Sequence, residues 1–278
     1  MELHLNEREL YVEGIIKDAW QIFKRHLPVL LPSIILYIIL GFTVDTFWHI
    51  LFRYHRKGHF LGHQLFNVTS NVLRDFIIIS LILIADNAIK GEAVTFKETI
   101  KKTCGFWPSS IWANFLALLI ILGMLLLIVV PGIVWAICLY FVTYAVVLQG
   151  KKGKAALNYS KSLVKGNWWK ILFISFVFGA LTIAPYTCTV IFYKIFHNEL
   201  GFSSVMDRLP LELVLISCLF GSFVYCFTII ANVVLFRNIE YLKYISEPVE
   251  KPMSPLDLIP TFGKDNVAPP RYIDHAGE

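Results

Sequence analysis

Residues 110–130 form an unbroken run of 21 residues without a charged side chain, SIWANFLALLIILGMLLLIVV. A helix of about 20 apolar residues, rising about 1.5 Å per residue, matches the thickness of the hydrocarbon core of a bilayer. The rest of the chain has the same character: 56% of its 278 residues are hydrophobic and 16% are charged. Because a typical soluble domain has about 25% charged residues, this composition excludes a soluble enzyme, a disordered protein and a collagen-like chain. It predicts a multi-span membrane protein.

Six segments are long and apolar enough to be transmembrane helices, which predicts an all-α integral membrane domain over residues 1–245. The predicted spans are 28–50, 70–89, 110–130, 133–149, 169–193 and 211–236. Only Pro131-Gly132 separates the third span from the fourth, and this pair predicts a tight helical hairpin. Residues 246–278 contain six prolines and are predicted to be a cytoplasmic tail with little structure of its own.

The lysines and arginines predict how the chain is oriented in the membrane. With the N-terminus in the cytoplasm, sixteen of them flank the inner ends of the spans and six flank the outer ends. The positive-inside rule therefore places both termini in the cytoplasm. The net charge of +5 is explained by this topology better than by a nucleic-acid-binding patch. Residues 1–26 contain four glutamates and no apolar core, so the first span is expected to be an uncleaved anchor.

A short amphipathic segment precedes each odd-numbered span, at 18–28, 95–108 and 155–170. We predict three interfacial helices on the cytoplasmic side, with their apolar faces in the acyl boundary and their lysines toward anionic headgroups. Each of these helices and the hairpin after it would form one of three repeated units, although any helix before a span can have this pattern. In the third segment, one helical stripe contains Ala156, Leu157, Ser160, Leu163 and Val164. The candidate headgroup contacts are Lys151, Lys152, Lys154, Lys161 and Lys165.

The stretch 131–170 has the most specific motifs of the chain. They are Pro131-Gly132-Ile133, Phe141, Gln149-Gly150, Ala156-Leu157, Ser160 and Leu163-Val164-Lys165-Gly166-Asn167-Trp168-Trp169-Lys170. This pattern resembles the membrane domain attached to some glycerophosphodiester phosphodiesterases, and related six-span bacterial inner-membrane proteins of uncharacterised function. Those proteins have a Pro-Gly-Ile hairpin, a Glu-Gly pair, an Ala-Leu-x-x-Ser helix and a Gly-x-Trp-Trp entry to the next span.

The resemblance implies a protein of the bacterial cytoplasmic membrane that is tied to lipid or envelope biology. Gln149 stands where the family usually has Glu, so a role that needs this carboxylate is not carried over. No soluble segment is long enough for a hydrolase barrel of about 250 residues. Phosphodiesterase activity is therefore not implied.

Two acidic residues lie within the second predicted span. Asp75 and Asp86 are eleven residues apart, about three helical turns, and so share one face of a helix. They are candidates for a polar track that carries a proton, an ion or a headgroup. Alternatively, both residues lie near the ends of the span, and Asp86 forms an ordinary i,i+4 pair with Lys90.

Two further patterns each allow a functional and an inert interpretation. Pro185 lies inside the fifth span and predicts a kink there. The hydroxyls of Thr182, Thr187 and Thr189 are expected to bond carbonyls that the proline frees. The kink is either a functional hinge or an inert feature of the helix. Four histidines crowd the first outer loop with spacing that suits zinc, although Gly58 and Gly62 interrupt the helix this requires, and a wet loop near headgroups is the alternative. The histidines are His49, His55, His59 and His63.

The sequence therefore predicts a non-enzymatic bacterial inner-membrane protein that associates with lipids or with an envelope membrane complex. Its expected partners are anionic headgroups and other membrane subunits, not nucleic acid. No catalytic group, metal or cofactor is expected, because no hydrolase, metalloprotease, P-loop or dinucleotide motif stands in a usable context. Trp168 and Trp169 are expected to anchor the depth of the helix that they begin. The alternatives are a small transporter or lipid-translocating subunit, which would use Pro185 and the Asp75/Asp86 pair, and an accessory subunit that stabilises a larger membrane assembly.

Overall fold

The structure, a computed structural model, describes residues 12–54, 60–92, 95–197 and 211–246. Every regular element in these ranges is an α-helix, so the prediction of an all-α chain is confirmed there. The helices are α1 (Val12–Tyr54), α2 (Phe60–Lys90), α3 (Phe96–Leu127), α4 (Val129–Cys138), α5 (Val142–Gln149), α6 (Lys154–Val164), α7 (Trp168–His197) and α9 (Leu211–Ser246).

Five helical stretches in the described ranges are long and apolar enough to cross a membrane. They are Val12–Leu40, Phe96–Leu127, Val129–Gln149, Trp168–Phe196 and Leu215–Lys243. Five of the six predicted spans fall largely within these stretches. The remaining one, 70–89, is helical as part of α2 but contains Arg74, Asp75 and Asp86, which lower its apolar character. The chain is therefore a helical protein with several membrane-compatible segments.

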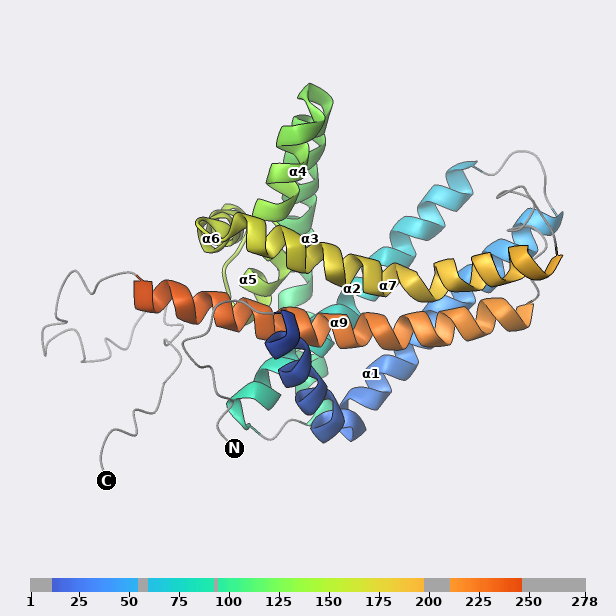
Figure 1. Ribbon diagram of the computed structural model, residues 1–278, viewed down its shortest axis with the longest axis horizontal. Helices are drawn as coiled ribbons and strands as arrows, with labels where there is room; N and C mark the ends of the chain where they lie inside the picture. Colours follow the sequence, from blue (N-terminus) through green and yellow to red (C-terminus); the bar gives the residue numbers. More distant parts are fainter. Residues whose placement is uncertain (1–11, 55–59, 93–94, 198–210, 247–278) are drawn as a thin grey trace, which may run out of the picture.

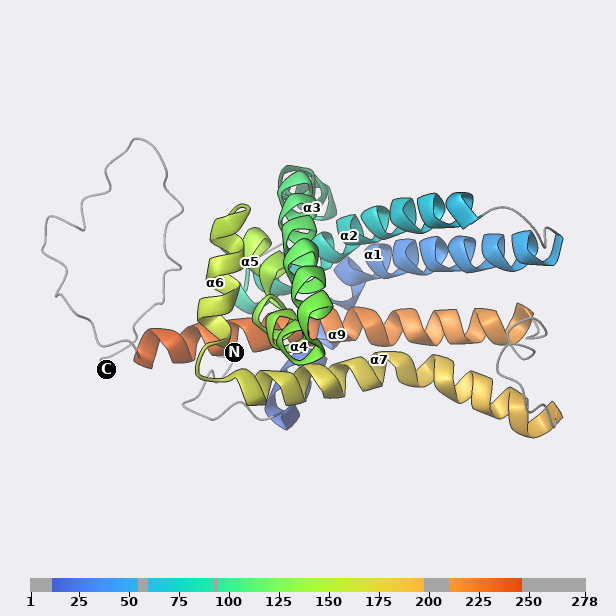
Figure 2. The same cartoon turned by 90° about the horizontal axis from the view of Figure 1, so that it is seen from above.

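The long helices α1, α2, α7 and α9 run side by side toward one end of the molecule, and α9 packs against the other three (Figure 1, Figure 2). Helices α1 and α2 pack together, as do α3 and α4, and α7 and α9. The α3–α4 hairpin projects away from the long helices (Figure 1). Residues 229–236 of α9 contribute a continuous buried stretch to the central core: Ile229, Ile230, Ala231, Val233, Val234, Leu235 and Phe236 are all buried.

The first two predicted interfacial helices are not separate elements. Segment 18–28 is the first part of α1, and segment 95–108 is almost wholly the first part of α3. Pro28 and Pro32 lie inside α1, whose ribbon bends where its colour passes from dark to mid blue (Figure 1). Proline in a helix interior can kink a helix without ending it. Only the third segment forms a distinct helix, α6.

The hairpin turn lies three residues earlier than predicted. Helix α3 ends at Leu127, Ile128 is extended with φ −156° and ψ 139°, and α4 begins at Val129. Pro131 and Gly132 therefore lie in the first turn of α4 and do not form the turn itself. Proline is tolerated there, because the first N–H groups of a helix have no intrahelical partner in any case.

Gly132 has a packing role in this hairpin. A Cβ added to it would lie 2.9 Å from Leu125 Cδ1 and 3.0 Å from Leu125 Cα. The arms of the hairpin thus approach closely at this point because residue 132 has no side chain, as small residues allow elsewhere in packed membrane helices. Gly132 therefore provides a close contact between the two helices of the hairpin and does not form its turn, which is the role that the sequence had predicted.

The fourth predicted span, 133–149, is interrupted. Helix α4 ends at Cys138 and α5 begins at Val142, so the three residues between them are not helical. A break of this kind frees backbone donors and acceptors, which need partners when they are buried.

Helix α7 contains Pro185 and curves along its length (Figure 2). The hydroxyls of Thr182, Thr187 and Thr189 bond the backbone carbonyls of Phe178, Ile183 and Pro185, at 2.7, 2.8 and 3.0 Å. The carbonyl that Pro185 frees is the one four residues earlier, in Leu181. The expected rescue of that carbonyl by the threonines is therefore wrong, and the threonines bond their own helical turns.

Two predictions fall outside the described part of the chain. The structure does not describe the tail 247–278, His55 or His59. His49 lies in α1 and His63 in α2, and only their backbone is described. The proposed histidine cluster and the tail are thus not tested.

Candidate functional site

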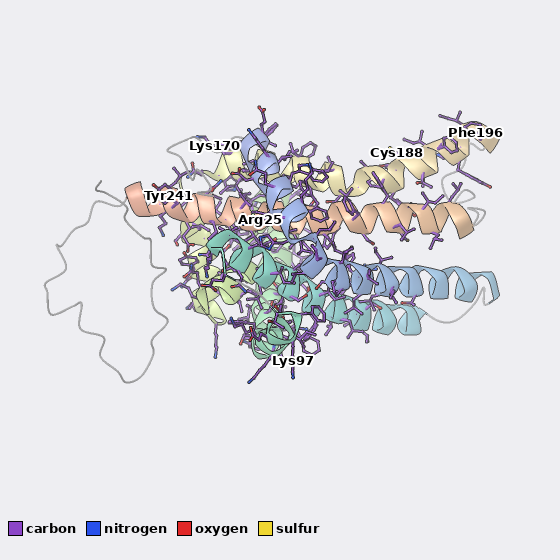
Figure 3. The ribbon with its side chains drawn as sticks, turned by 90° about the horizontal axis from the view of Figure 1, so that it is seen from below. Arg25, Lys97, Lys170, Cys188, Phe196 and Tyr241 are labelled. Carbon is purple, nitrogen blue, oxygen red and sulfur yellow. The ribbon has the colours of Figure 1, made fainter. Side chains whose placement is uncertain are left out.

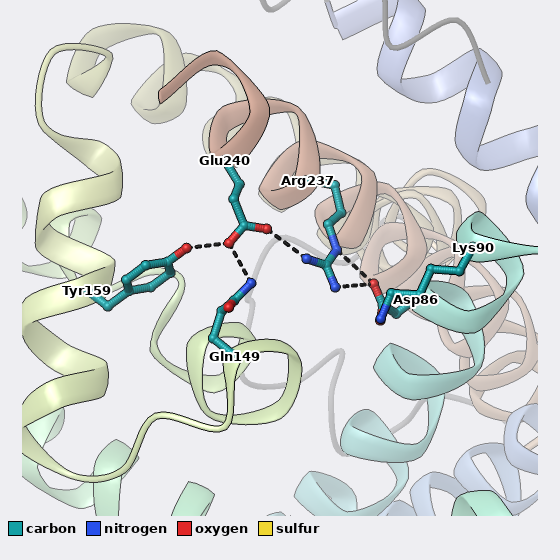
Figure 4. Close-up of polar contacts among 6 residues, drawn as sticks. All are labelled: Asp86, Lys90, Gln149, Tyr159, Arg237 and Glu240. Carbon is teal, nitrogen blue, oxygen red and sulfur yellow. Dashed lines mark hydrogen bonds and ion pairs between the residues drawn. The ribbon is translucent and has the colours of Figure 1, made fainter. Parts of the chain in front are cut away.

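A polar network joins α2 to α9 at one end of the bundle (Figure 4). At its centre, Arg237 Nε donates to Asp86 Oδ1 at 2.7 Å, and Arg237 Nη2 lies 2.6 Å from the same oxygen. Asp86 is 4% exposed and Arg237 7% exposed, so water reaches neither group freely. Asp86 Oδ2 also pairs with Lys90 Nζ at 2.7 Å, one turn further along α2. The predicted i,i+4 pair between Asp86 and Lys90 is confirmed.

Glu240 extends the network to α5 and α6. Its Oε2 accepts a hydrogen bond from Arg237 Nη1 at 2.7 Å. Its Oε1 accepts hydrogen bonds from Gln149 Nε2 and from the Tyr159 hydroxyl (Figure 4). Each of the four carboxylate oxygens of Asp86 and Glu240 thus has a donor. Two acids and two bases balance, so the group is electrically neutral when all four are charged.

Local sequence explains how these side chains meet. Arg237 and Glu240 are three residues apart in α9 and therefore lie on one face of that helix. Gln149 is the last residue of α5, where Gly150 adopts a left-handed conformation with φ +63° and ends the helix. Glycine takes this conformation without steric cost. The motif residue Gly150 thereby turns the chain toward α6, which carries Tyr159.

The glutamine at position 149 suits this site better than the glutamate that the resemblance leads one to expect. Gln149 donates to Glu240, and an ionised glutamate has no proton to donate. A second carboxylate there would also repel Glu240 in a partly buried setting. Gln149, which stands in place of the expected glutamate, therefore has a hydrogen-bond acceptor in α9, the carboxylate of Glu240.

The six side chains of this network hold four helices together, and we call them the clamp: Asp86, Lys90, Gln149, Tyr159, Arg237 and Glu240 (Figure 4). Charges removed from water are costly unless they are paired and hydrogen-bonded, and every carboxylate oxygen here is. The arrangement fixes the ends of α2, α5, α6 and α9 against one another.

The structure does not link Asp75 to Asp86 by a polar path along α2. Ile79, Leu81 and Ile82, which lie between them, are fully buried and apolar. The Ser80 hydroxyl donates to the Ile77 carbonyl at 2.7 Å and also contacts the Ser33 hydroxyl at 3.3 Å. The predicted polar track is thus interrupted by core packing, while Asp86 is turned to Arg237.

Ser160 closes the break between α4 and α5. The Phe141 N–H donates to Ser160 Oγ at 3.2 Å, and Ser160 Oγ donates to the Cys138 carbonyl at 2.8 Å. Ser160 is fully buried. The Ser160 hydroxyl of α6 is therefore the hydrogen-bond partner of one backbone donor, the Phe141 N–H, and one backbone acceptor, the Cys138 carbonyl, at the break in the helix. This contact explains the serine of the Ala-Leu-x-x-Ser motif.

The apolar stripe of α6 is buried at the predicted positions, but it faces protein and not acyl chains. Ala156 and Leu157 pack with residues of α3, α4 and α5, and Leu163 and Val164 belong to the core shared with α9. The prediction of a stripe in the acyl boundary is wrong, because the hairpin and α9 cover this face of the helix.

The predicted headgroup lysines lie on and beside the uncovered side of α6. Lys152, Lys154, Lys161 and Lys165 are exposed, and Lys151 is half-buried. Two of the ammonium groups lie over aromatic rings: Lys161 Nζ is 4.6 Å from the ring centroid of Trp135, and Lys151 Nζ is 5.0 Å from that of Tyr159. Among the residues labelled in Figure 3, Arg25 and Lys170 lie toward the Tyr241 half of the molecule, away from the Cys188 and Phe196 end of α7.

Gly166 lies in the turn before α7, and the two tryptophans begin this helix. Gly166 has φ +92°, which lets the chain turn sharply between α6 and α7. The rings of Trp168 and Trp169 meet edge to face, with centroids 4.6 Å apart. Trp169 is 75% exposed, as a membrane-interface anchor would be, whereas Trp168 is partly buried. Its Nε1 is buried and has no hydrogen-bond partner among the described residues.

Within the described residues, no group of three or more His, Cys, Asp or Glu side chains could hold a metal ion.

Sequence reasoning missed Arg237, Glu240 and Tyr159 as parts of a site. The available signal was the i,i+3 spacing of an arginine and a glutamate at the end of a long apolar run. The sequence analysis also did not identify the partly buried contact between Tyr140 and Asn232, in which the tyrosine hydroxyl donates to Asn232 Oδ1 at 3.0 Å.

The fold and the clamp define an all-helical protein with several apolar helices that could cross a membrane, tied at one end by buried charges. Residues 102–239 match a domain of unknown function, DUF7847. This stretch includes Gln149, Tyr159 and Arg237 of the clamp. The match does not show the link to glycerophosphodiester phosphodiesterases that the motifs of 131–170 suggest. No curated protein and no solved structure matches the chain.

Proposed function

We propose that this chain is a non-enzymatic integral protein of the bacterial cytoplasmic membrane, which associates with anionic lipid headgroups through α6 and the loop before it. In this proposal both termini lie in the cytoplasm and the six apolar segments are embedded in the membrane. The positive-inside count and the motifs of 131–170 support this orientation and location.

One observation carries the lipid proposal. The apolar stripe of α6 is buried against protein, which directs the other side of the helix outward, and Lys152, Lys154, Lys161 and Lys165 are exposed there. A cluster of basic side chains held at a membrane surface attracts anionic lipids by about 1 kcal/mol per lysine. The ring of Trp169 is exposed, as expected for a tryptophan at the membrane–water interface, and this supports the placement of α6 at the membrane surface.

The test is native mass spectrometry of the protein purified from its own membrane. We expect the wild-type chain to retain anionic phospholipids in preference to zwitterionic ones, and a variant with Lys152, Lys154 and Lys165 changed to Gln to lose that preference. The matched control removes three exposed lysines of α3, Lys97, Lys101 and Lys102. Equal loss in both variants would show an effect of net charge, and unchanged retention in the first variant would disprove the proposal.

The same measurement addresses the two alternatives. An accessory subunit would appear with other protein masses bound. A transporter that uses Asp75 and Asp86 has less support, because Asp86 is held by Arg237 and Lys90 and buried apolar side chains separate it from Asp75.

A further inference from the structure

The tip of the α3–α4 hairpin is apolar and uncovered. Its residues are among the most exposed of the large hydrophobic residues that the structure describes: Leu126 is 81% exposed, Leu127 74% and Val130 67%. No charged residue occurs between Lys102 and Lys151. A hairpin that crosses a bilayer and returns places its turn at the far water surface, where polar groups are usual. This turn has the composition of a segment surrounded by acyl chains.

The position of α6 shows how deep the hairpin can go. The α6 ammonium of Lys161 lies 4.6 Å from the Trp135 ring of α4. Because a lysine is costly at mid-bilayer and tryptophan prefers the interface, this pair belongs at headgroup level. Trp135 is seven residues beyond Ile128, which is about 10 Å along a helix. The hydrocarbon core is about 30 Å thick, so the tip falls well short of the opposite surface.

The other end of α6 supports the same depth. A methyl group on Gly153, at the start of α6, would lie 3.7 Å from Trp112 Cδ1 in α3. Helix α6 therefore lies across the base of the hairpin, with one end near Trp112 and the other near Trp135 (Figure 1, Figure 2). Its exposed lysines, Lys154 and Lys161, require polar surroundings along this length. Only the part of the hairpin beyond Trp135 is left for the membrane interior.

The backbone of the turn fits an apolar environment. A break in a helix costs free energy in hydrocarbon for each backbone group that it leaves unpaired. Here a single residue, Ile128, is non-helical, and its N–H still donates to the Met124 carbonyl at 3.1 Å. The Gly132 N–H donates to the Ile128 carbonyl at 3.4 Å, and Pro131 has no N–H to satisfy.

We infer that the α3–α4 hairpin, which runs across the long helices (Figure 1), lies within the leaflet on the side that carries α6, and that its tip ends among the acyl chains of that leaflet. The predicted spans 110–130 and 133–149 then do not cross the bilayer. Both arms still return to the same side, so the placement of the other segments is unchanged. The inference rests on the membrane location in the proposed function but not on the binding of anionic headgroups.

The test measures the depth of a nitroxide label in vesicles of phosphatidylcholine, which has no net charge, so it is independent of the headgroup proposal. A full-length chain with the native cysteines replaced receives one cysteine, Val130→Cys at the tip or Lys165→Cys on the exposed side beyond α6. We expect the label at position 130 to collide readily with oxygen and rarely with a water-soluble nickel chelate, and the label at position 165 to show the reverse. Nickel collisions at position 130 as frequent as at position 165 would overturn the inference.

A second variant keeps the native cysteines. Val130→Lys places a charge at the tip, and we expect a lower midpoint of thermal unfolding in the same vesicles than for Val130→Met. Equal midpoints for the two variants would mean that position 130 lies in water, and would also overturn the inference.

Discussion

Asp86 and Arg237 are 151 positions apart in the chain, yet the guanidinium of Arg237 contacts Asp86 Oδ1 twice, at 2.7 and 2.6 Å. Both side chains are buried. This contact joins the end of α2 to α9, and Glu240 carries the connection to α5 and α6. The clamp therefore links helices from both halves of the sequence.

Replacing Arg237 with Gln should destabilise the protein by about 3–5 kcal/mol, because it leaves Asp86 buried without its main partner. The midpoint of thermal unfolding in mild detergent measures this loss. The double variant Asp86→Leu/Arg237→Met should recover much of it, since both charges are then removed together.

Lys90 provides the matched control for that experiment. Its side chain is 39% exposed, and an exposed ion pair contributes at most about 1 kcal/mol. Lys90→Met should therefore have a small effect. Equal effects of Lys90→Met and Arg237→Gln would contradict the assignment of Arg237 as the main partner of Asp86.

Gln149→Glu should destabilise the protein at neutral pH by about 1–3 kcal/mol, because a donor to Glu240 is lost and a like charge is added. The loss should shrink under acidic conditions, where the introduced carboxyl group takes up a proton. Thermal unfolding measured across a pH series checks this. Gln149→Leu, which removes the donor without adding charge, should show a flatter dependence on pH. The same pH profile for both variants would contradict the explanation by repulsion.

Ser160→Ala should cost about 1–3 kcal/mol, since it leaves the Phe141 N–H and the Cys138 carbonyl buried without a partner. Ser175→Ala is the control, because the Ser175 hydroxyl bonds only the Leu172 carbonyl of its own helical turn. Comparable midpoints of unfolding for the two variants would show that Ser160 does not hold the break between α4 and α5.

Gly132→Ala should separate the arms of the hairpin, because the new Cβ would lie 2.9 Å from Leu125 Cδ1 and 3.0 Å from Leu125 Cα. Such overpacking costs about 1–3 kcal/mol. Gly123→Ala is a control within the same hairpin, since nothing lies within 4 Å of the added methyl group. Alanine there should be neutral or slightly stabilising. A stable Gly132→Ala protein would contradict the close approach of the arms.

Periodicity predicted which residues of α6 are buried but not what buries them. Ala156, Leu157, Leu163 and Val164 are buried at the predicted positions, against protein helices. An amphipathic pattern is the same whether its apolar face meets lipid or protein, so the sequence pattern alone could not distinguish them.

The hairpin and the clamp show two further limits. Pro131 predicted a turn, but a proline in the first turn of a helix costs little, and the turn lies at Ile128 instead. The pair of Asp86 with Lys90 was predicted because it is local. Its pair with Arg237 depends on how α2 packs against α9, and no spacing along the chain reports this.

The central position of α9 also bears on the biogenesis of this protein. Helix α9 is the most buried of the membrane-compatible helices, it packs against α1, α2 and α7, and it supplies Arg237. It is also the last described helix to leave the ribosome. The earlier helices must therefore remain without this contact, with Asp86 paired to Lys90 and not to Arg237, until α9 has been synthesised. A chain truncated before α9 would leave that surface uncovered, so α9 is a condition for a stable fold.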